Sequence, residues 1–351
     1  MYYRDAVSLR PVDNPPNPWE HTRGEWLDAP PMAKLEVYEE KAKTVLSENT
    51  SPDLGFRWSL NPYRGCFHAC AYCYARPSHQ YWDFGAGTDF ESKIVVKLNA
   101  AERLREHFEK RSWVGESVTF SGNTDCYQPL EAAYRLTRGC LEVCAAYRNP
   151  VSLITKGALV RRDIDVLQEL AKHGAAFVNF SIAFADDAMA RKLEPHAPRP
   201  STRFEAMRAV VEAGIPVGLA LAPIIPGVND SQVPEVLERA RDCGARSAFR
   251  VLLRLPTEVN PVFFGRLTEE YPDRVGKVEH AMREMREGKL YDSRFGHRGK
   301  GSGSRWGATA WLFDATCRKL GINAEERYDA PDRPTPFRRP GGQLTLFGGS
   351  V

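Results

Sequence analysis

The sequence has no long apolar run. It contains no stretch of about 18 predominantly apolar residues, so no membrane-spanning helix is expected. Its first residues, Met1–Val7, also lack the apolar core of a secretory signal peptide. Both absences argue against a membrane or secreted protein, and we expect a cytoplasmic protein with no membrane partner.

Net charge is also nearly absent. The 351 residues carry 48 basic and 45 acidic side chains, and this balance of +3 does not by itself indicate a polyanionic partner. The chain is 42% hydrophobic, which is enough for a large core in one or two domains. In a reducing compartment its eight cysteines are expected to be ligands or small buried side chains, because disulfides are rare there.

Three of these cysteines, Cys66, Cys70 and Cys73, lie close together with the spacing C-x3-C-x2-C. A fourth cysteine is missing nearby, since the next one is Cys126. Three thiolates can hold three irons of a cubane [4Fe–4S] cluster and leave one iron open to a reacting molecule. A structural zinc site completed by His68 is the alternative, but a ligand two residues after Cys66 fits a tetrahedral site poorly.

Short apolar runs alternate with amphipathic stretches from residue 56 onward. Strands are expected over 56–60, 94–98, 118–121, 151–155, 177–182, 217–225 and 248–255. Helices are expected over 100–110, 131–148, 162–173, 201–213 and 231–242, where apolar residues recur at three- and four-residue spacing. This alternation predicts an α/β fold with a parallel sheet covered by helices. The cysteine loop follows the first strand, and such folds gather their chemistry at strand ends.

The cysteine loop also resembles a known signature. Residues 61–75 read Asn-Pro-Tyr-Arg-Gly-Cys-Phe-His-Ala-Cys-Ala-Tyr-Cys-Tyr-Ala, which is similar to the signature loop of the radical S-adenosylmethionine superfamily, including the aromatic Tyr72 before the third cysteine. The segments 61–77, 124–131, 152–156 and 222–230 resemble a bacterial group of these enzymes related to spore photoproduct lyase. The resemblance covers about residues 47–307.

The resemblance implies a partial (β/α)6 barrel with N- and C-terminal extensions. It implies that Cys66, Cys70 and Cys73 bind a 4Fe-4S cluster whose open iron is chelated by S-adenosylmethionine (SAM). One electron, from a reductant such as flavodoxin or ferredoxin, then cleaves SAM to a 5′-deoxyadenosyl radical, which abstracts hydrogen from a substrate. We divide the chain into an N-terminal extension (1–50, with a possible helix over 33–46), the barrel domain with C-terminal helices (51–327) and a Pro-rich tail (328–351), which is expected to be a linker or disordered over 329–342.

Polar residues after the expected strands are candidates to hold SAM. Asn123, Thr124 and Asp125 occupy the place where relatives bind the amino group, and a turn with an Asx cap is the alternative. Lys156 and Ser181 stand where similar enzymes use a Lys and a Ser for the carboxylate and ribose of the cofactor. Their alternative is an ordinary solvated position.

Two further positions are candidates for the cofactor. Arg203, early in the next helix, is a candidate partner for the SAM carboxylate. The segment 222–230 resembles the adenine-side motif, in which Ile224 and Ile225 would pack against the ring. A strand-to-helix turn with Asp230 as the helix N-cap is compatible with the same residues.

The other cysteines in this half of the chain give a weaker signal. Spore photoproduct lyase has a hydrogen-donating cysteine in the loop after this same strand, and Gly122 stands at the aligned position. Cys126 lies nearby and is the candidate catalytic residue, although it is shifted from that place. Cys140 and Cys144 share a helix face and are either core thiols or, with Cys126, ligands of a second cluster.

The C-terminal end suggests a partner. Gln343, Leu344, Leu346 and Phe347 belong to a Gln-Leu-Thr-Leu-Phe string, which resembles peptides that dock bacterial DNA repair and replication proteins on the sliding clamp. A tail that folds back on the barrel is the alternative. The basic, glycine-rich stretch 294–306 suits a nucleic-acid backbone, or a loop that closes over a small substrate.

Three functional hypotheses follow. The first is a radical SAM enzyme, of the lyase or oxidoreductase class, that acts in nucleic-acid (DNA) repair or modification. The second is radical modification of a peptide or small metabolite. The third is a non-catalytic metal-binding module.

Overall fold

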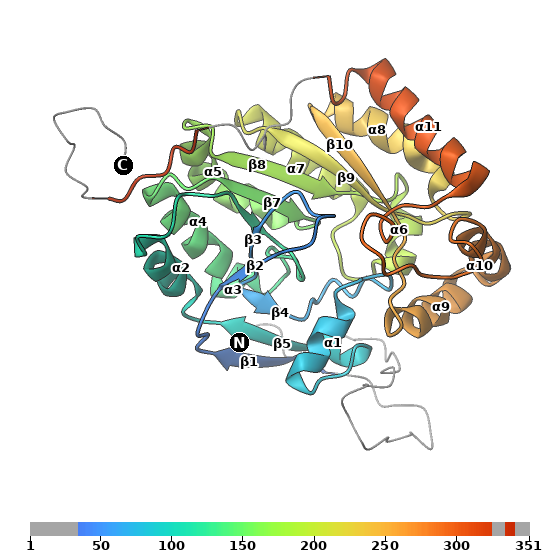
Figure 1. Cartoon of the computed structure of the whole chain (residues 1–351), viewed down its shortest axis with the longest axis horizontal. Helices are drawn as coiled ribbons and strands as arrows, with labels where there is room; N and C mark the ends of the chain where they lie inside the picture. The colour runs from blue at the N-terminus through green and yellow to red at the C-terminus, as the bar shows by residue number, and fades with distance from the viewer. Residues whose placement is uncertain (1–33, 325–333, 341–351) are drawn as a thin grey trace.

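The computed structural model describes residues 34–324 and 334–340. At its centre lies a seven-stranded sheet (Figure 1). From edge to edge the strands are β10 (Ser247–Leu252), β9 (Val217–Ile224), β8 (Ala176–Ser181), β7 (Val151–Thr155), β6 (Val118–Phe120), β3 (Trp58–Leu60) and β2 (Leu46–Glu48). Six strands run parallel, and β2 pairs antiparallel with β3.

Helices cover the outer face of the sheet (Figure 1). They include α2 (Ala100–Glu109), α4 (Leu136–Ala146), α5 (Ile164–Ala171), α7 (Pro200–Glu212), α8 (Val233–Asp242) and α11 (Gly303–Leu320). Shorter or peripheral helices are α1 (Thr88–Ser92), α3 (Glu131–Tyr134), α6 (Asp187–Leu193), α9 (Val259–Glu270) and α10 (Val275–Glu284). Six parallel strands covered by helices confirm the expected α/β fold with an incomplete barrel. Across 34–324 and 334–340, no helix is long and apolar enough to span a membrane.

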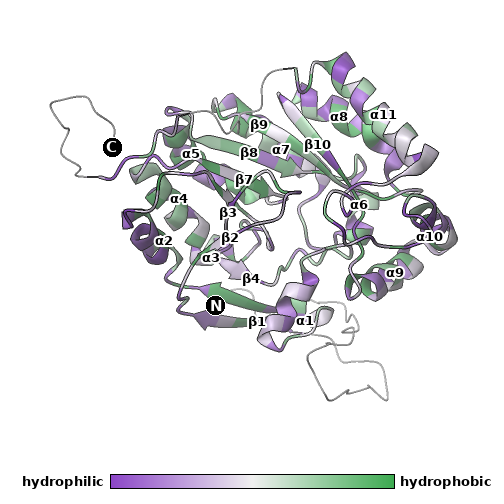
Figure 2. Ribbon diagram, viewed as in Figure 1, coloured by the Kyte–Doolittle hydropathy of each residue, from purple (hydrophilic) through white to green (hydrophobic). Residues whose placement is uncertain are grey.

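Alternation along the strands gives the barrel its two faces. In β7, Leu153 is fully buried in the main core, whereas its neighbours Ser152 and Ile154 line a central cavity. Figure 2 shows that strands such as β7 and β8 are largely hydrophobic, whereas the outer helix α2 is largely hydrophilic. The apolar side therefore holds the helices, and the other side is free to hold a ligand.

A second, smaller sheet corrects two expectations. Its order is β1 (Glu36–Glu40), β5 (Lys93–Lys97) and β4 (Tyr63–Arg64). A helix over 33–46 was wrong, because Glu36–Glu40 pairs in register with β5. The strand expected over 94–98 exists, but it lies outside the barrel. An apolar run in the sequence predicts a buried strand, but it does not predict which other strand pairs with it.

Two further expectations also need correction. The helix expected over 131–148 is broken at Arg135, whose φ of 54° ends α3 and starts α4. Within the segment expected to be a linker or disordered, residues 334–340 dock on the barrel. Phe337 stacks on Tyr147, with ring centroids 6.1 Å apart, and Arg338 donates its backbone N–H to the Tyr147 carbonyl. The proposed boundary at residue 50 stays a prediction.

Candidate functional site

The cysteine loop lies between β4 and the 3-10 helix η1 (Arg76–Trp82). Its entry needs a glycine, because Gly65 has φ of 74° and a Cβ there would lie 2.8 Å from the Lys93 carbonyl oxygen. Neighbouring segments hold the loop on both sides: the backbone N–H of Cys66 donates to the Phe90 carbonyl, and that of Ala71 donates to the Leu193 carbonyl. The loop conformation is thus set by the surrounding fold.

The loop opens onto a cavity of about 2060 Å³. Nine residues selected from sequence line it together: Cys66, Cys70, Cys73, Tyr72, Asn123, Thr124, Asp125, Lys156 and Ser181. They come from the cysteine loop and from the carboxyl ends of β6, β7 and β8. The parallel sheet brings these distant positions to one edge.

The three cysteines suit a cluster better than a single ion. In the described part of the chain, no three His, Cys, Asp or Glu side chains converge on one ion position, whereas cluster thiolates ligate separate irons. Burial raises the pKa of the Cys66 thiol to about 12 and that of Cys70 well above its usual range. Buried thiolates therefore need a cationic group such as iron beside them.

Asp125 is fixed at the end of β6. It accepts hydrogen bonds from Thr155 Oγ1 (2.6 Å), from the Lys156 backbone N–H (2.7 Å) and from the Tyr127 backbone N–H (2.9 Å). His68 Nδ1 lies 3.5 Å from Asp125 Oδ2, the oxygen that also accepts from the Lys156 N–H. The Asp125 carboxylate is thereby held at the cavity wall, where it can receive an ammonium group.

Lys156 points into the same cavity. Its Nζ donates to Ser181 Oγ at 3.1 Å and lies 5.6 Å from the centroid of the Tyr72 ring. Burial lowers the pKa of Lys156, but the neighbouring Cys70 and Glu194 outweigh that effect and leave the pKa raised. The ammonium is therefore cationic and suits a carboxylate or hydroxyl ligand.

Arg203 is brought near the cavity without lining it. It is 1% exposed, and its guanidinium donates to the Ser181 carbonyl (3.0 Å), to the Pro198 carbonyl (2.7 Å) and to Glu194. Its donors are thus engaged within the protein, and direct pairing with SAM stays a prediction.

Glu194 is a residue that sequence reasoning missed. This 1% exposed carboxylate pairs with Arg203 and accepts from the Tyr72 hydroxyl. Burial raises its pKa, but Arg203 and Lys156 outweigh burial and leave the pKa of Glu194 lowered. Nothing in Leu-Glu-Pro-His at 193–196 signals this role, because Tyr72 lies 122 residues away and Arg203 lies nine residues away, beyond the spacing of a helical pair.

The adenine-side segment is only partly exposed to the cavity. Ala222 and Pro223 line it, whereas Ile224 is fully buried in the core. Asn229 holds the turn by accepting from the Ile225 N–H (2.6 Å) and donating to the Ala183 carbonyl (2.7 Å). The N-cap expected at Asp230 was wrong, since Gln232 is the N-cap of α8.

Cys126 is also not on the cavity wall. It is 0% exposed and packs in the main core with Cys140 and Cys144. The catalytic role of Cys126 and a second cluster therefore stay predictions, and burial in the apolar core argues against both. The clamp-like residues 343–347 lie outside the described residues.

The stretch 294–306 contributes to the cavity as well. Phe295 and Lys300 line it and are exposed. Arg298 pairs with Asp53 at 2.5 Å and contacts Ser51, so the loop beside β10 is tied to the loop between β2 and β3. These contacts connect the two edges of the open barrel.

Comparisons with known proteins agree with this geometry. Residues 60–240 match the model of the Radical SAM superfamily. An uncharacterized protein of Mycobacterium tuberculosis is 34% identical over 283 residues, which cover 79% of this chain and 83% of that protein. An uncharacterized protein of Methanocaldococcus jannaschii is 30% identical over 198 residues, 56% of this chain and 71% of that protein.

The fold is similar to that of spore photoproduct lyase. A solved mutant of that protein, with bound AdoMet and dinucleoside spore photoproduct, has a TM-score of 0.60 at 15% identity, covering 82% of this chain and 80% of that chain. A second structure, in complex with dinucleoside spore photoproduct, has a TM-score of 0.59 at 15% identity with the same coverage. At this identity the likeness concerns the fold.

Proposed function

The chain belongs to the radical SAM superfamily, and from that premise we propose that it abstracts a hydrogen atom from a nucleic acid, in DNA repair or modification. Cationic and aromatic side chains on the cavity wall carry this proposal, whereas the cavity volume of about 2060 Å³ includes the space for the cluster and SAM. The bound [4Fe–4S] cluster and SAM supply the radical that takes the hydrogen. The side chains of the protein bind the cluster and SAM, orient the substrate and keep water away from the reacting atoms.

Each part of the cavity wall has a share in that work. Cys66, Cys70 and Cys73 hold the cluster. The Asp125 carboxylate suits the amino group of SAM, and the Lys156 ammonium suits its carboxylate, because each offers the opposite charge at the strand ends. The Tyr72 phenol, held by Glu194, packs beside Lys156 and limits water near the reacting atoms.

Cationic and aromatic side chains on the same wall support a nucleic-acid substrate. Arg254 lies 4.7 Å from the centroid of the Tyr74 ring, and its buried Nε has no hydrogen-bond partner among residues 34–324 and 334–340. Exposed Phe295 and Lys300 lie on the cavity wall too. Cations paired with aromatic rings hold a phosphate backbone and stack a base, so this set fits a nucleotide better than an apolar metabolite.

Tyr74 has a second possible role. Its hydroxyl donates to the carbonyl of Gly122 at 2.8 Å, at the position where the related lyase carries its hydrogen-donating cysteine. Apart from the cluster cysteines no thiol is found among the residues that line the cavity. We assign the Tyr74 phenol as the group best placed to return a hydrogen atom to a substrate radical, a step that forms a C–H bond, breaks the phenol O–H bond and leaves a tyrosyl radical.

The test uses the anaerobically reconstituted protein with dithionite and SAM. Ultraviolet-irradiated DNA oligonucleotides are expected to increase 5′-deoxyadenosine formation, or to change its ratio to substrate consumed. Arg254→Gln should raise the DNA concentration needed for half-maximal effect by about tenfold, while cleavage of SAM without DNA is retained. Stimulation by peptides or small metabolites, with no response to any DNA, would contradict the nucleic-acid proposal and support the second hypothesis.

The sliding-clamp partner is a separate part of the proposal. It is supported by the string Gln343–Phe347 alone. Deletion of residues 343–347 should abolish clamp binding in a pull-down or titration, and unchanged binding would refute it.

A further inference from the structure

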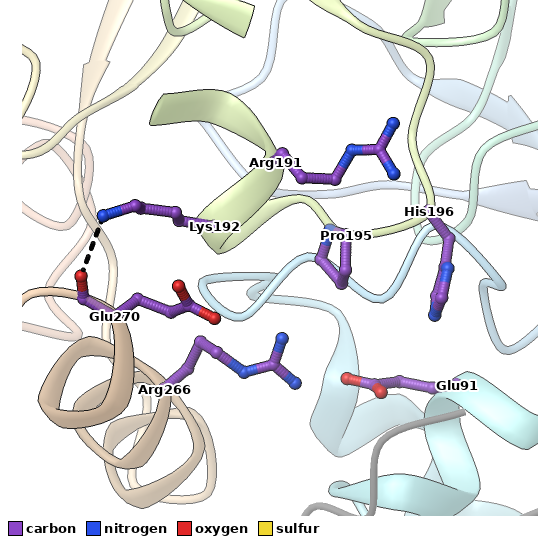
Figure 3. Close-up of a pocket in the computed structure, with 7 residues that line it drawn as sticks. All are labelled: Glu91, Arg191, Lys192, Pro195, His196, Arg266 and Glu270. Atoms are coloured by element: carbon purple, nitrogen blue, oxygen red, sulfur yellow. Dashed lines mark hydrogen bonds between the residues drawn. The ribbon is translucent and has the colours of Figure 1, made fainter. Parts of the chain in front are cut away.

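A second pocket lies behind the cysteine loop. It measures about 330 Å³ and is lined by Glu91, Arg191, Lys192, Pro195, His196, Arg266 and Glu270 (Figure 3). Its walls come from α1, from α6 with the residues that follow it, and from α9. The mechanism described above uses none of these side chains.

The pocket is in direct contact with the back of the cysteine loop. The His196 ring stacks on Phe67, with centroids 5.1 Å apart, and the His196 backbone N–H donates to the His68 carbonyl at 3.3 Å. Phe67 follows Cys66 in sequence and is 5% exposed. The cysteine side chains line the cavity while Phe67 faces His196, so the loop separates the cavity from this pocket.

A second connection runs through Glu91. Its carboxylate pairs with the fully buried Arg76, which donates to the Cys70 carbonyl at 2.9 Å. The His196 wall of the pocket thus contacts the cysteine loop at Phe67, and the Glu91 wall contacts it at Cys70 through Arg76. An electron that enters here reaches the cluster through side chains packed against the cysteine loop.

The pocket carries a net positive charge. Arg191 is exposed, Lys192 is half-buried, and the side chain of Arg266 forms the floor, with its guanidinium directed into the pocket (Figure 3). Glu91 pairs with Arg76, and Arg266 pairs with Glu269 at 3.6 Å, so Arg191 and Lys192 against Glu270 leave the positive excess. Such a patch suits an acidic protein surface, whose separate carboxylates can pair with these cations one by one. A continuous phosphate backbone fits less well, because Glu270 stands among the cations.

We propose that this pocket is the docking site for a small acidic electron-transfer protein of the flavodoxin or ferredoxin class. One electron passes from the reduced partner to the cluster, so the partner is oxidised by one electron and the cluster is reduced by one. No proton and no bond change accompany the step. Carboxylates of the partner pair with the exposed Arg191 and the half-buried Lys192 at the rim of the pocket. The inference rests on the proposed function only in requiring a reducible cluster.

The test compares two matched charge reversals in the full-length, reconstituted protein. Arg191→Glu and Arg318→Glu each reverse an exposed arginine in the last turn of a helix, α6 in the first case and α11 in the second. Arg191→Glu should weaken binding of an acidic flavodoxin about fivefold by calorimetry, and should slow its anaerobic reduction of the cluster by a similar factor. Arg318→Glu should change neither by more than about 1.5-fold.

Dithionite separates docking from cluster damage. Cluster reduction by dithionite should be the same in both variants and in the unchanged protein. Equal flavodoxin binding by the two variants, or a dithionite rate lowered in Arg191→Glu alone, would overturn the proposal. Weakened DNA binding by Arg191→Glu with unchanged flavodoxin binding would also overturn it. Flavodoxin binding is read without substrate or SAM, so failure of the proposed reaction leaves this test intact.

Discussion

Replacing Glu194 by Gln should destabilise the protein and weaken SAM binding together. The carboxylate is 1% exposed and is the counter-ion of Arg203, which is equally buried. Gln keeps the volume and a carbonyl acceptor, but it removes the negative charge. Breaking a buried ion pair from one side costs about 3–5 kcal/mol, and the retained acceptor places this variant near 3 kcal/mol. That is a large part of the roughly 5–15 kcal/mol that stabilises a typical domain.

The pH dependence supplies a second measurement. The pKa of Glu194 is lowered in the folded state, so its contribution is present above the unfolded value of 4.5 and is lost as pH falls below it. Between pH 5 and pH 3 the unchanged protein should therefore lose stability more steeply than Glu194→Gln. Urea unfolding of the apoprotein at several pH values measures both quantities.

Two controls make the result decisive. Glu205→Gln removes an exposed carboxylate from α7 and should change the free energy of unfolding by less than about 0.5 kcal/mol. The double variant Glu194→Gln/Arg203→Met should lose much less stability than the sum of the losses in the two single variants, because the two side chains stabilise each other. A loss below about 1 kcal/mol in Glu194→Gln, or additive losses in the double variant, would refute the assignment of Glu194 as the buried counter-ion.

Further predictions concern single positions. Gly157→Ala should lower the free energy of unfolding by about 1–3 kcal/mol and weaken SAM binding, because the added Cβ would lie 2.4 Å from Tyr127 Cβ. In the control Gly265→Ala on α9, the added Cβ has no atom of the described residues within 4 Å, so urea unfolding should show unchanged or slightly higher stability. Burial lowers the pKa of His79 to about 4, so the free energy of unfolding should fall by about 3 kcal/mol as pH falls from 6.5 to 4. His79→Leu should make stability nearly independent of pH over this range, and an unchanged pH dependence would contradict the prediction. Tyr74→Phe should retain SAM cleavage but reduce product formation by at least about tenfold, and full turnover would exclude its phenol as the hydrogen source.

Local patterns in the sequence were enough to predict the barrel and the cysteine loop. The spacing of Cys66, Cys70 and Cys73 needs no tertiary information, and the parallel sheet necessarily brings Asp125, Lys156 and Ser181 to one edge. The burial of Cys126 was not predictable, because a cysteine near a strand end can face either side of the sheet.

Long-range contacts account for what the sequence did not show. Glu194 acquires its role only through Tyr72 and Arg203, and Arg254 only through a loop that packs near Tyr74. The exposed strand Glu36–Glu40 has no burial pattern of its own and exists because β5 offers an edge. Contacts of this kind depend on the whole fold, so they cannot be predicted from a local sequence pattern.

Anaerobic reconstitution followed by SAM cleavage tests the central claim most directly. The protein should bind about four irons and four sulfides per chain, and should form 5′-deoxyadenosine and methionine when a reductant and SAM are added. Cys70→Ala should lose both the cluster and the product. Purified protein that holds zinc in place of iron, or a reconstituted cluster that yields no 5′-deoxyadenosine on reduction, would contradict the account.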